Sequence, residues 1–243
     1  FLVDKEPKPS EPPPTTQKSP CLRAMSSMTQ LLPWERSLLA LVHDKSEADF
    51  KSVAILIGPI ILPGLMTSIH EMIVKTALKY NNAITIESSV WFPRPIDTSK
   101  VDDPKWLDLA WLAHESVHVL EYAAAGTEAF LKTYVWEALK AGFNHEKIPH
   151  ERRANHIERV VYRLLARFPE LAGAIKTCDN GTILTVLEQR RDAYQAAVQE
   201  LMGEQEEAQE PAEPYSGSES QEGEVVPLGE QLVEAELEEG LEY

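Results

Sequence analysis

Cysteine is scarce in this sequence. The chain of 243 residues contains only Cys21 and Cys178, which lie far apart and form no CxxC pair. Two isolated cysteines provide neither a framework of disulfides nor a thiolate zinc site. This usage fits a reducing compartment slightly better than an oxidising one.

Long apolar runs are also missing. The most apolar stretch, SVAILIGPIILPGL at 52–65, is interrupted by Gly58, Pro59 and Pro63. A helix that spans a membrane needs about 20 apolar residues in a row. The opening FLVDKEPKPS lacks the charged start and apolar core of a signal peptide. We therefore expect a soluble protein with no membrane partner, either cytoplasmic or delivered by a non-classical secretion route.

Basic side chains are absent from the C-terminal end. Residues 201–243 contain 14 Glu and no Asp, Lys or Arg, while the rest of the chain contains 25 acidic and 23 basic residues. The net charge of −16 therefore belongs mainly to the tail, and the remainder is nearly neutral. Binding of nucleic acid requires a basic stripe. We expect no nucleic-acid partner.

Composition divides the chain into three parts. Residues 1–22 are rich in Pro, Lys and Glu, which predicts a disordered linker. Residues 203–243 are predicted to be a disordered acidic tail that could contact a protein partner. The segment 23–202 between them carries enough apolar residues for a core, and we expect it to be a single folded domain.

The pattern of apolar residues predicts an α+β fold that is mainly helical. Apolar spacing favours helices at 34–44 and 68–80. The segment NNAITIESSVWFP at 81–93 predicts a β-hairpin or small sheet, because it is rich in strand formers and is followed by prolines. A helix at 102–126 should begin at Asp103 and end at Gly126. Further helices are predicted at 127–142, 149–168 and about 183–202.

The stretch LAWLAHESVHVLEY at 109–122 contains the pattern HExxH. Residues four apart lie on one face of a helix, so His114 and His118 can direct their rings at one metal ion. Glu115 is rotated by about 100° from His114 and can act on a water as general base without binding the ion. The alternative is an ordinary amphipathic helix. The uncharged neighbours of the motif favour the metal site, because charged ones would be buried in a dry cleft.

A hydrolytic zinc site needs a third protein ligand and an open position. Glu151, which opens the run ERRAN after Pro149, is the leading candidate, although a first-turn carboxylate also stabilises a helix through its dipole. Asn155, one turn later, could orient a ligand histidine. The rival ligands are His145, His150 and His156.

The segments LAHESVHVLEY and IPHERRAN resemble the gluzincin group of zinc metallopeptidases. The run AITIESSVWFP…LAHESVHV…YVWEAL…IPHERRAN is similar to the small zincin-like domain of bacterial proteins associated with extracellular contractile injection systems, over about residues 70–165. The resemblance implies one Zn²⁺ held by His114, His118 and Glu151, with Glu115 as the catalytic base. The departures are Ser116 for an apolar residue, Glu121 for Gln and Asn155 for Asp, and we expect Glu121 to be solvated.

The expected function is zinc-dependent hydrolysis of a peptide bond in a protein or peptide substrate. The substrate would lie extended along the segment 83–92. The donor for the oxyanion stays open among Tyr122, Tyr134, His150 and His156, although Tyr134, like Trp136, is more typical of a core position. The alternatives are an inactive zincin-like scaffold that binds partners through its acidic tail, and hydrolysis of an amide or lipid ester.

Overall fold

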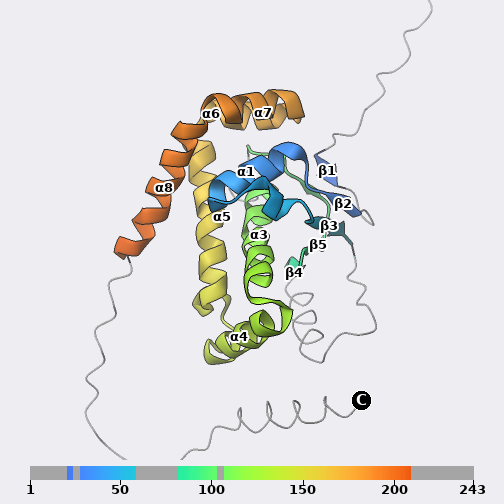
Figure 1. Cartoon of the computed structure of the whole chain (residues 1–243), viewed down its shortest axis with the longest axis vertical. Coiled ribbons are helices and arrows are strands. Elements are labelled where there is room, and N and C mark those ends of the chain that lie inside the picture. The colour runs from blue at the N-terminus through green and yellow to red at the C-terminus, as the bar shows by residue number, and fades with distance from the viewer. Residues whose placement is uncertain (1–20, 24–27, 59–81, 103–106, 209–243) are drawn as a thin grey trace, which may run out of the picture. The chain divides into compact units, whose positions relative to one another are not determined.

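Two long helices, α3 (Asp108–Ala125) and α5 (Pro149–Arg167), lie side by side through the middle of the structure (Figure 1). They pack against each other more extensively than any other pair of described helices. The chain passes from one to the other through α4 (Thr127–Lys140) and the short 3-10 turn η2 (His145–Lys147). This connection reverses the chain and brings the first turn of α5 beside the second half of α3.

The structure is a computed structural model that describes residues 21–23, 28–58, 82–102 and 107–208. These residues belong to one compact unit that ends at Ala208. Most of the predicted linker, the predicted helix at 68–80 and nearly all of the acidic tail lie outside the described residues.

The strands form two small sheets. In the smaller one, β1 (Leu22–Arg23) pairs antiparallel with β6 (Ile96–Asp97). In the larger one, β3 and β5 are parallel and the other neighbours are antiparallel. Its order is β2 (Met28–Gln30), β3 (Ala54–Ile57), β5 (Ser89–Phe92) and β4 (Ile84–Ile86). Among the described strands, β4 therefore lies at an edge of the sheet, and it packs against α3.

The hairpin predicted at 81–93 is confirmed. Strands β4 and β5 are joined by a two-residue turn, and Ile86 lies opposite Ser89. Glu87 in this turn has a φ of 53°, the left-handed conformation that short hairpin turns require. The expected mainly helical α+β class is also confirmed for the described residues.

The helix predicted at 34–44 is confirmed as α1 (Pro33–His43), which the 3-10 turn η1 (Glu47–Phe50) follows. The single helix predicted at about 183–202 is wrong. The chain forms α7 (Asn180–Gln189) and α8 (Arg191–Ala208), which are separated at Arg190, whose backbone leaves the helical conformation. No Pro or Gly marks this break in the sequence, so the apolar spacing alone did not reveal it. Between α5 and α7 lies α6 (Pro169–Thr177).

The start predicted for α3 is also wrong, since the helix begins at Asp108 with Leu107 as its N-cap, while Asp103 lies outside the described residues. Asp108 is instead bound to the strands: its carboxylate accepts hydrogen bonds from Arg94 at 2.6 Å and from the main-chain N–H of Asp97 at 2.7 Å. The predicted end is correct. Gly126 has a φ of 81°, which favours glycine and allows α4 to start at once.

One apolar core holds α3 between the sheet and α5. Trp34 of α1, Ile55 and Phe92 of the sheet, Leu112 of α3 and Leu164 of α5 are all fully buried in it. Burial of each such side chain stabilises the fold by roughly 1.5–3 kcal/mol. The helix that carries the HExxH motif is therefore fixed on both sides.

Cys21 and Cys178 form a disulfide, with their Cα atoms 6.1 Å apart. This disulfide was not predicted from the sequence, and disulfides are more typical of oxidising compartments than of the reducing one that cysteine usage slightly favoured. The two residues are separated by 157 positions, and only the packing of β1 beside the end of α6 brings them together. The sequence gives no signal for that proximity.

A buried ion pair fixes the same N-terminal strand. The guanidinium of Arg23 lies 2.6 Å from the carboxylate of Glu35 on α1, and both side chains are almost fully buried. The hydroxyl of Thr98 donates a further hydrogen bond of 2.6 Å to Glu35. Loss of one partner would leave a buried charge unpaired, which costs about 3–5 kcal/mol.

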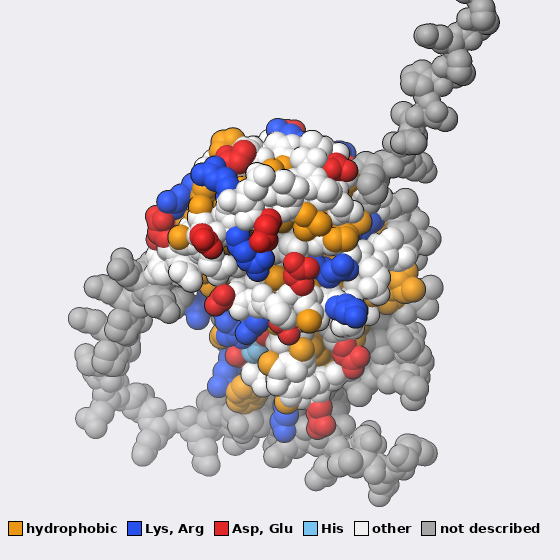
Figure 2. Space-filling model, turned by 45° about the horizontal axis from the view of Figure 1, so that its top comes forward, with side chains coloured by type: hydrophobic (Ala, Val, Ile, Leu, Met, Phe, Trp, Pro, Cys, Tyr) orange, Lys and Arg blue, Asp and Glu red, His pale blue; other side chains and the backbone are white. Residues whose placement is uncertain are grey.

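The surface carries charges of both signs. On the face in Figure 2, acidic and basic side chains are interspersed over the described part of the chain. No described helix is long and apolar enough to cross a membrane.

Candidate metal centre

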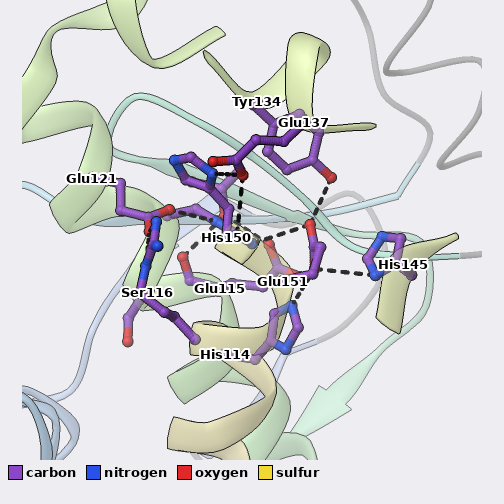
Figure 3. Close-up of polar contacts among 12 residues, drawn as sticks. His114, Glu115, Ser116, Glu121, Tyr134, Glu137, His145, His150 and Glu151 are labelled. Carbon is purple, nitrogen blue, oxygen red and sulfur yellow. Dashed lines mark hydrogen bonds and ion pairs between the residues drawn. The ribbon is translucent and has the colours of Figure 1, made fainter. Parts of the chain in front are cut away.

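Three predicted ligands meet between α3 and α5. His114 and His118 lie one turn apart on α3. Glu151 lies in the first turn of α5, and its carboxylate faces His114 (Figure 3). One ligand atom from each lies within 4.8 Å of the others, and all three side chains are buried. The structure therefore brings the predicted set together in a group that could hold a metal ion.

The separations suit a small tetrahedral ion. Oε2 of Glu151 lies 3.2 Å from Nε2 of His114, and Oε1 lies 3.5 Å from Nε2 of His118. Ligand atoms about 2.0–2.1 Å from a tetrahedral Zn²⁺ lie about 3.3 Å from one another. Both measured separations are close to that value.

The carboxylate of Glu151 also has unused binding capacity. Its Oε2 atom is buried and forms no well-directed hydrogen bond among the described residues, although Nε2 of His114 lies 3.2 Å and Nδ1 of His145 lies 3.1 Å from it. Buried polar atoms without a partner are rare and costly in folded proteins. A cation between the carboxylate and the rings would satisfy this oxygen, so the donor set fits a divalent metal.

In both ligand histidines, Nε2 faces Glu151 and the other ring nitrogen, Nδ1, lies near a second carboxylate. Nδ1 of His118 lies 3.0 Å from Oε2 of Glu121 in a hydrogen bond, and Arg153 holds the other oxygen of Glu121 at 2.7 Å. Nδ1 of His114 lies 3.4 Å from Oε2 of Glu158, an ion-pair distance rather than a formed hydrogen bond. Such partners fix the tautomer and orientation of a metal-binding ring.

These contacts correct two expectations. Glu121 is not solvated, because it is partly buried and paired with His118 and Arg153. The orienting role predicted for Asn155 falls instead to Glu121 and Glu158, since no described contact joins Asn155 to a ligand histidine. Glu158 follows Glu151 by two helical turns and therefore lies on the same face of α5.

The acidic surroundings change the titration of the two rings. Burial alone would lower the pKa of His114, but the carboxylates of Glu151 and Glu158 raise it to about 9. Burial likewise opposes protonation of His118, but Glu121 and Glu151 raise its pKa to about 10. Without a metal, both rings are therefore protonated at neutral pH.

The same pairing keeps Glu151 ionised. Burial would raise the pKa of its carboxyl, but the neighbouring rings of His114, His118 and His145 outweigh burial and hold that pKa well below its usual range. A buried carboxylate that stays charged is suited to bind a cation.

Glu115 lies beside the three ligands but outside their group. Its side chain is 5% exposed, and its Oε2 atom accepts a hydrogen bond of 2.7 Å from the hydroxyl of Thr85 on β4. This is the position expected of a carboxylate that acts on a water next to the ion without binding the ion. No sequence pattern singles out Thr85, because the pairing depends on how β4 packs against α3.

Tyr134 of α4 also belongs to the site. Its hydroxyl donates a hydrogen bond of 2.6 Å to Oε1 of Glu151, and its ring lies 6.2 Å from that of His118. Burial and the charge of Glu151 raise the pKa of Tyr134, so it remains a neutral donor. The expectation that Trp136 is a core residue is wrong, because it is 46% exposed, whereas Tyr134 is partly buried and packs against the small apolar cluster of Tyr122, Phe130 and Leu131.

The three histidines considered as rival ligands lie outside the group. His145 of η2 is half exposed, but its Nδ1 atom lies 3.1 Å from Oε2 of Glu151 at the rim of the site. His150 is paired with Glu137 and packs against Tyr134. His156 is partly buried and has no described contact with the ligands.

Comparisons of the chain with family models, with curated proteins and with solved structures find no match. Assignment of a function therefore rests on the residues of the site and their arrangement.

Proposed function

We propose that this chain is a zinc-dependent hydrolase of peptide bonds, of the gluzincin type. The observation that carries the proposal is the convergence of His114, His118 and Glu151 in one buried group, with Glu115 beside it. Two imidazoles and one carboxylate form a ligand set typical of catalytic zinc and leave a fourth position for water or substrate.

The proposed cofactor is a single Zn²⁺ held by His114, His118 and Glu151. When bound, zinc supplies a Lewis acid that polarises a peptide carbonyl and makes a neighbouring water more acidic. The hydrogen bond from His118 to Glu121 and the neighbouring Glu158 would keep both rings oriented toward the ion.

Glu115 is the proposed general base and acid. Its carboxylate would take a proton from the attacking water and give that proton to the amine that leaves. The support for this role is its burial next to the ligands and its absence from their group.

Tyr134 is the proposed donor to the oxyanion. Of the four candidates, it is the one whose hydroxyl contacts a proposed ligand, at 2.6 Å from Oε1 of Glu151. A hydroxyl has one proton, so Tyr134 would have to turn it away from Oε1 of Glu151 to donate to the negative charge that develops on the carbonyl oxygen, and binding of that oxygen to the ion would favour the turn. Because burial raises the pKa of Tyr134, the proton is retained at neutral pH.

The proposed substrate is an extended segment of a protein or peptide. Strand β4 lies at an edge among the described strands and packs against the helix that carries the motif. An extended peptide can add to such an edge through main-chain hydrogen bonds. This mode of binding depends little on the side chains of the substrate.

We also propose that the enzyme acts in an oxidising environment, because the Cys21–Cys178 disulfide would not persist in a reducing one. A role for the acidic tail in binding a protein partner remains a proposal based on its composition.

Hydrolysis of casein and of fluorogenic peptides by the purified protein tests this function. We expect turnover by the wild type, loss of turnover on addition of a chelator, and recovery on addition of zinc. Glu115→Gln should bind zinc and show no turnover, and it is the control for a contaminating protease. A wild type that binds zinc but cleaves none of these substrates would favour the alternative of an inactive scaffold.

A further inference from the structure

We propose that Thr85 is a positioning residue that holds the carboxylate of Glu115 in place from the strand on which the substrate binds. The inference rests on the proposed function, and it adds a residue that the HExxH motif does not contain.

The contact is short and directed. The hydroxyl of Thr85 lies 2.7 Å from Oε2 of Glu115 and 3.2 Å from the main-chain oxygen of the same residue. A hydroxyl has one proton, and the carboxylate is the closer and more strongly accepting partner. Thr85 therefore donates to Oε2, and Oε1 of Glu115 is the oxygen that would act on the water.

Glu115 needs such a restraint. It is 5% exposed and interacts electrostatically with both ligand histidines, so its carboxylate lies close to the proposed ion. Among the described residues, Thr85 is the one whose side chain donates a hydrogen bond to this carboxylate. A carboxylate held by a fixed donor keeps its distance from the ion, whereas an unrestrained one can rotate toward the cation.

The main-chain N–H and C=O of Thr85 point away from β5, toward the side of β4 on which no described strand lies. Ile86 and Ser89 flank the two-residue turn and form a hydrogen-bonded pair of the antiparallel ladder. The next pair, Thr85 and Val90, is therefore a pair without ladder hydrogen bonds. Because hydrogen-bonded and non-hydrogen-bonded pairs alternate along the ladder, the N–H and C=O of Thr85 point away from β5.

One residue thus connects substrate binding with the general base. Among the described residues, no strand pairs with the outer side of Thr85, where a substrate strand could add, and its side chain holds Glu115. Threonine suits this position because its branched Cβ restricts the side chain and fixes the direction of the hydroxyl. Docking of a substrate on β4 would therefore fix the position of the carboxylate relative to the bound peptide.

Three substitutions test the role. Thr85→Val has nearly the same shape, favours a strand and removes the hydroxyl, whereas Thr85→Ser retains the hydroxyl. Thr185→Val is the matched control, because Thr185 is exposed on α7 and its hydroxyl bonds only to the main-chain oxygen of Gly181. Each protein is to be crystallised without metal and assayed with zinc on a fluorogenic peptide.

We expect the Glu115 carboxylate to leave its position in crystals of Thr85→Val and to keep it in Thr85→Ser and Thr185→Val. In the assay, kcat of Thr85→Val should fall about tenfold or more with KM nearly unchanged, because a hydrogen bond to a charged group is lost. Thr85→Ser should restore kcat. A purely structural role would not produce this separation of kcat from KM together with rescue by serine.

An unmoved carboxylate in Thr85→Val, or an unchanged kcat, would overturn the role of Thr85 while leaving the proposed function intact. A wild type that cleaves no peptide would instead reject the proposed function. In that case, the metal-free crystals still decide whether Thr85 holds Glu115.

Discussion

Nδ1 of His118 and Oε2 of Glu121 lie 3.0 Å apart, one turn of α3 from each other, and Arg153 holds the second oxygen of Glu121. The ring that is proposed to bind the ion through Nε2 is thus fixed through its other nitrogen. Glu121 and Arg153 therefore belong to the site, although neither is a proposed ligand.

Substitution of the outer carboxylates should weaken binding of zinc. We expect Glu121→Gln to reduce affinity about 10–100-fold, because loss of a partner of a ligand histidine has effects of this size. Glu158→Gln should reduce affinity less, since its contact with His114 is longer, at 3.4 Å. Competition with a chromophoric chelator measures the zinc affinity of both variants.

The control is Glu188→Gln, because Glu188 is an exposed residue of α7. If Glu121→Gln lowers the zinc affinity no more than this control does, Glu121 does not belong to the site.

Binding of zinc should release protons. In the metal-free protein, the pKa values of His114 and His118 are raised to about 9 and about 10, so both rings are protonated at pH 7 and must lose their protons to bind the ion. Affinity should therefore rise with pH until it passes those pKa values. Calorimetry at pH 7 in buffers of different ionisation enthalpy should give about two protons per zinc bound. Release of none would show that the rings are neutral before the metal binds.

Tyr134→Phe should reduce turnover and retain the metal. The hydroxyl of Tyr134 donates to Oε1 of Glu151, so its loss removes the proposed oxyanion donor without removing a ligand. We expect kcat to fall roughly 100–1,000-fold, as on loss of other oxyanion donors. Tyr122→Phe, in the same aromatic cluster, is the matched control. Equal kcat values for the two variants would assign the donor elsewhere.

Loss of the Cys21–Cys178 disulfide should lower stability. The bond closes a loop over a sequence separation of 157, and a cross-link of this length stabilises a fold by roughly 2–5 kcal/mol. Urea unfolding of the double variant Cys21→Ser/Cys178→Ser, compared with the oxidised wild type, measures the difference. The same midpoint for both proteins would show that the two thiols are not joined in solution.

The sequence predicted those parts of the site that depend on local geometry. His114, Glu115 and His118 lie on one helix, and their spacing alone determines which face they share. Glu151 could be predicted because a recognisable run surrounds it at the start of the next long helix. The mainly helical α+β class followed from apolar spacing in the same way.

The remaining features depend on packing between distant segments. Thr85 contacts Glu115 only because β4 packs against α3, and Cys21 meets Cys178 only because β1 lies near the end of α6. Tyr134 resembled a core residue because its neighbours are apolar. Glu158 could have been found from the sequence, since it lies two helical turns after Glu151.

The central claim is that two imidazoles of α3 and one carboxylate of α5 bind one metal ion, and the metal content of purified variants tests it most directly. Protein prepared without added zinc should contain about one zinc per chain in the wild type and in Glu115→Gln, and almost none in His118→Ala or Glu151→Ala. Circular dichroism should show that each variant is folded. A folded Glu151→Ala protein that still contains one zinc per chain would contradict the claim.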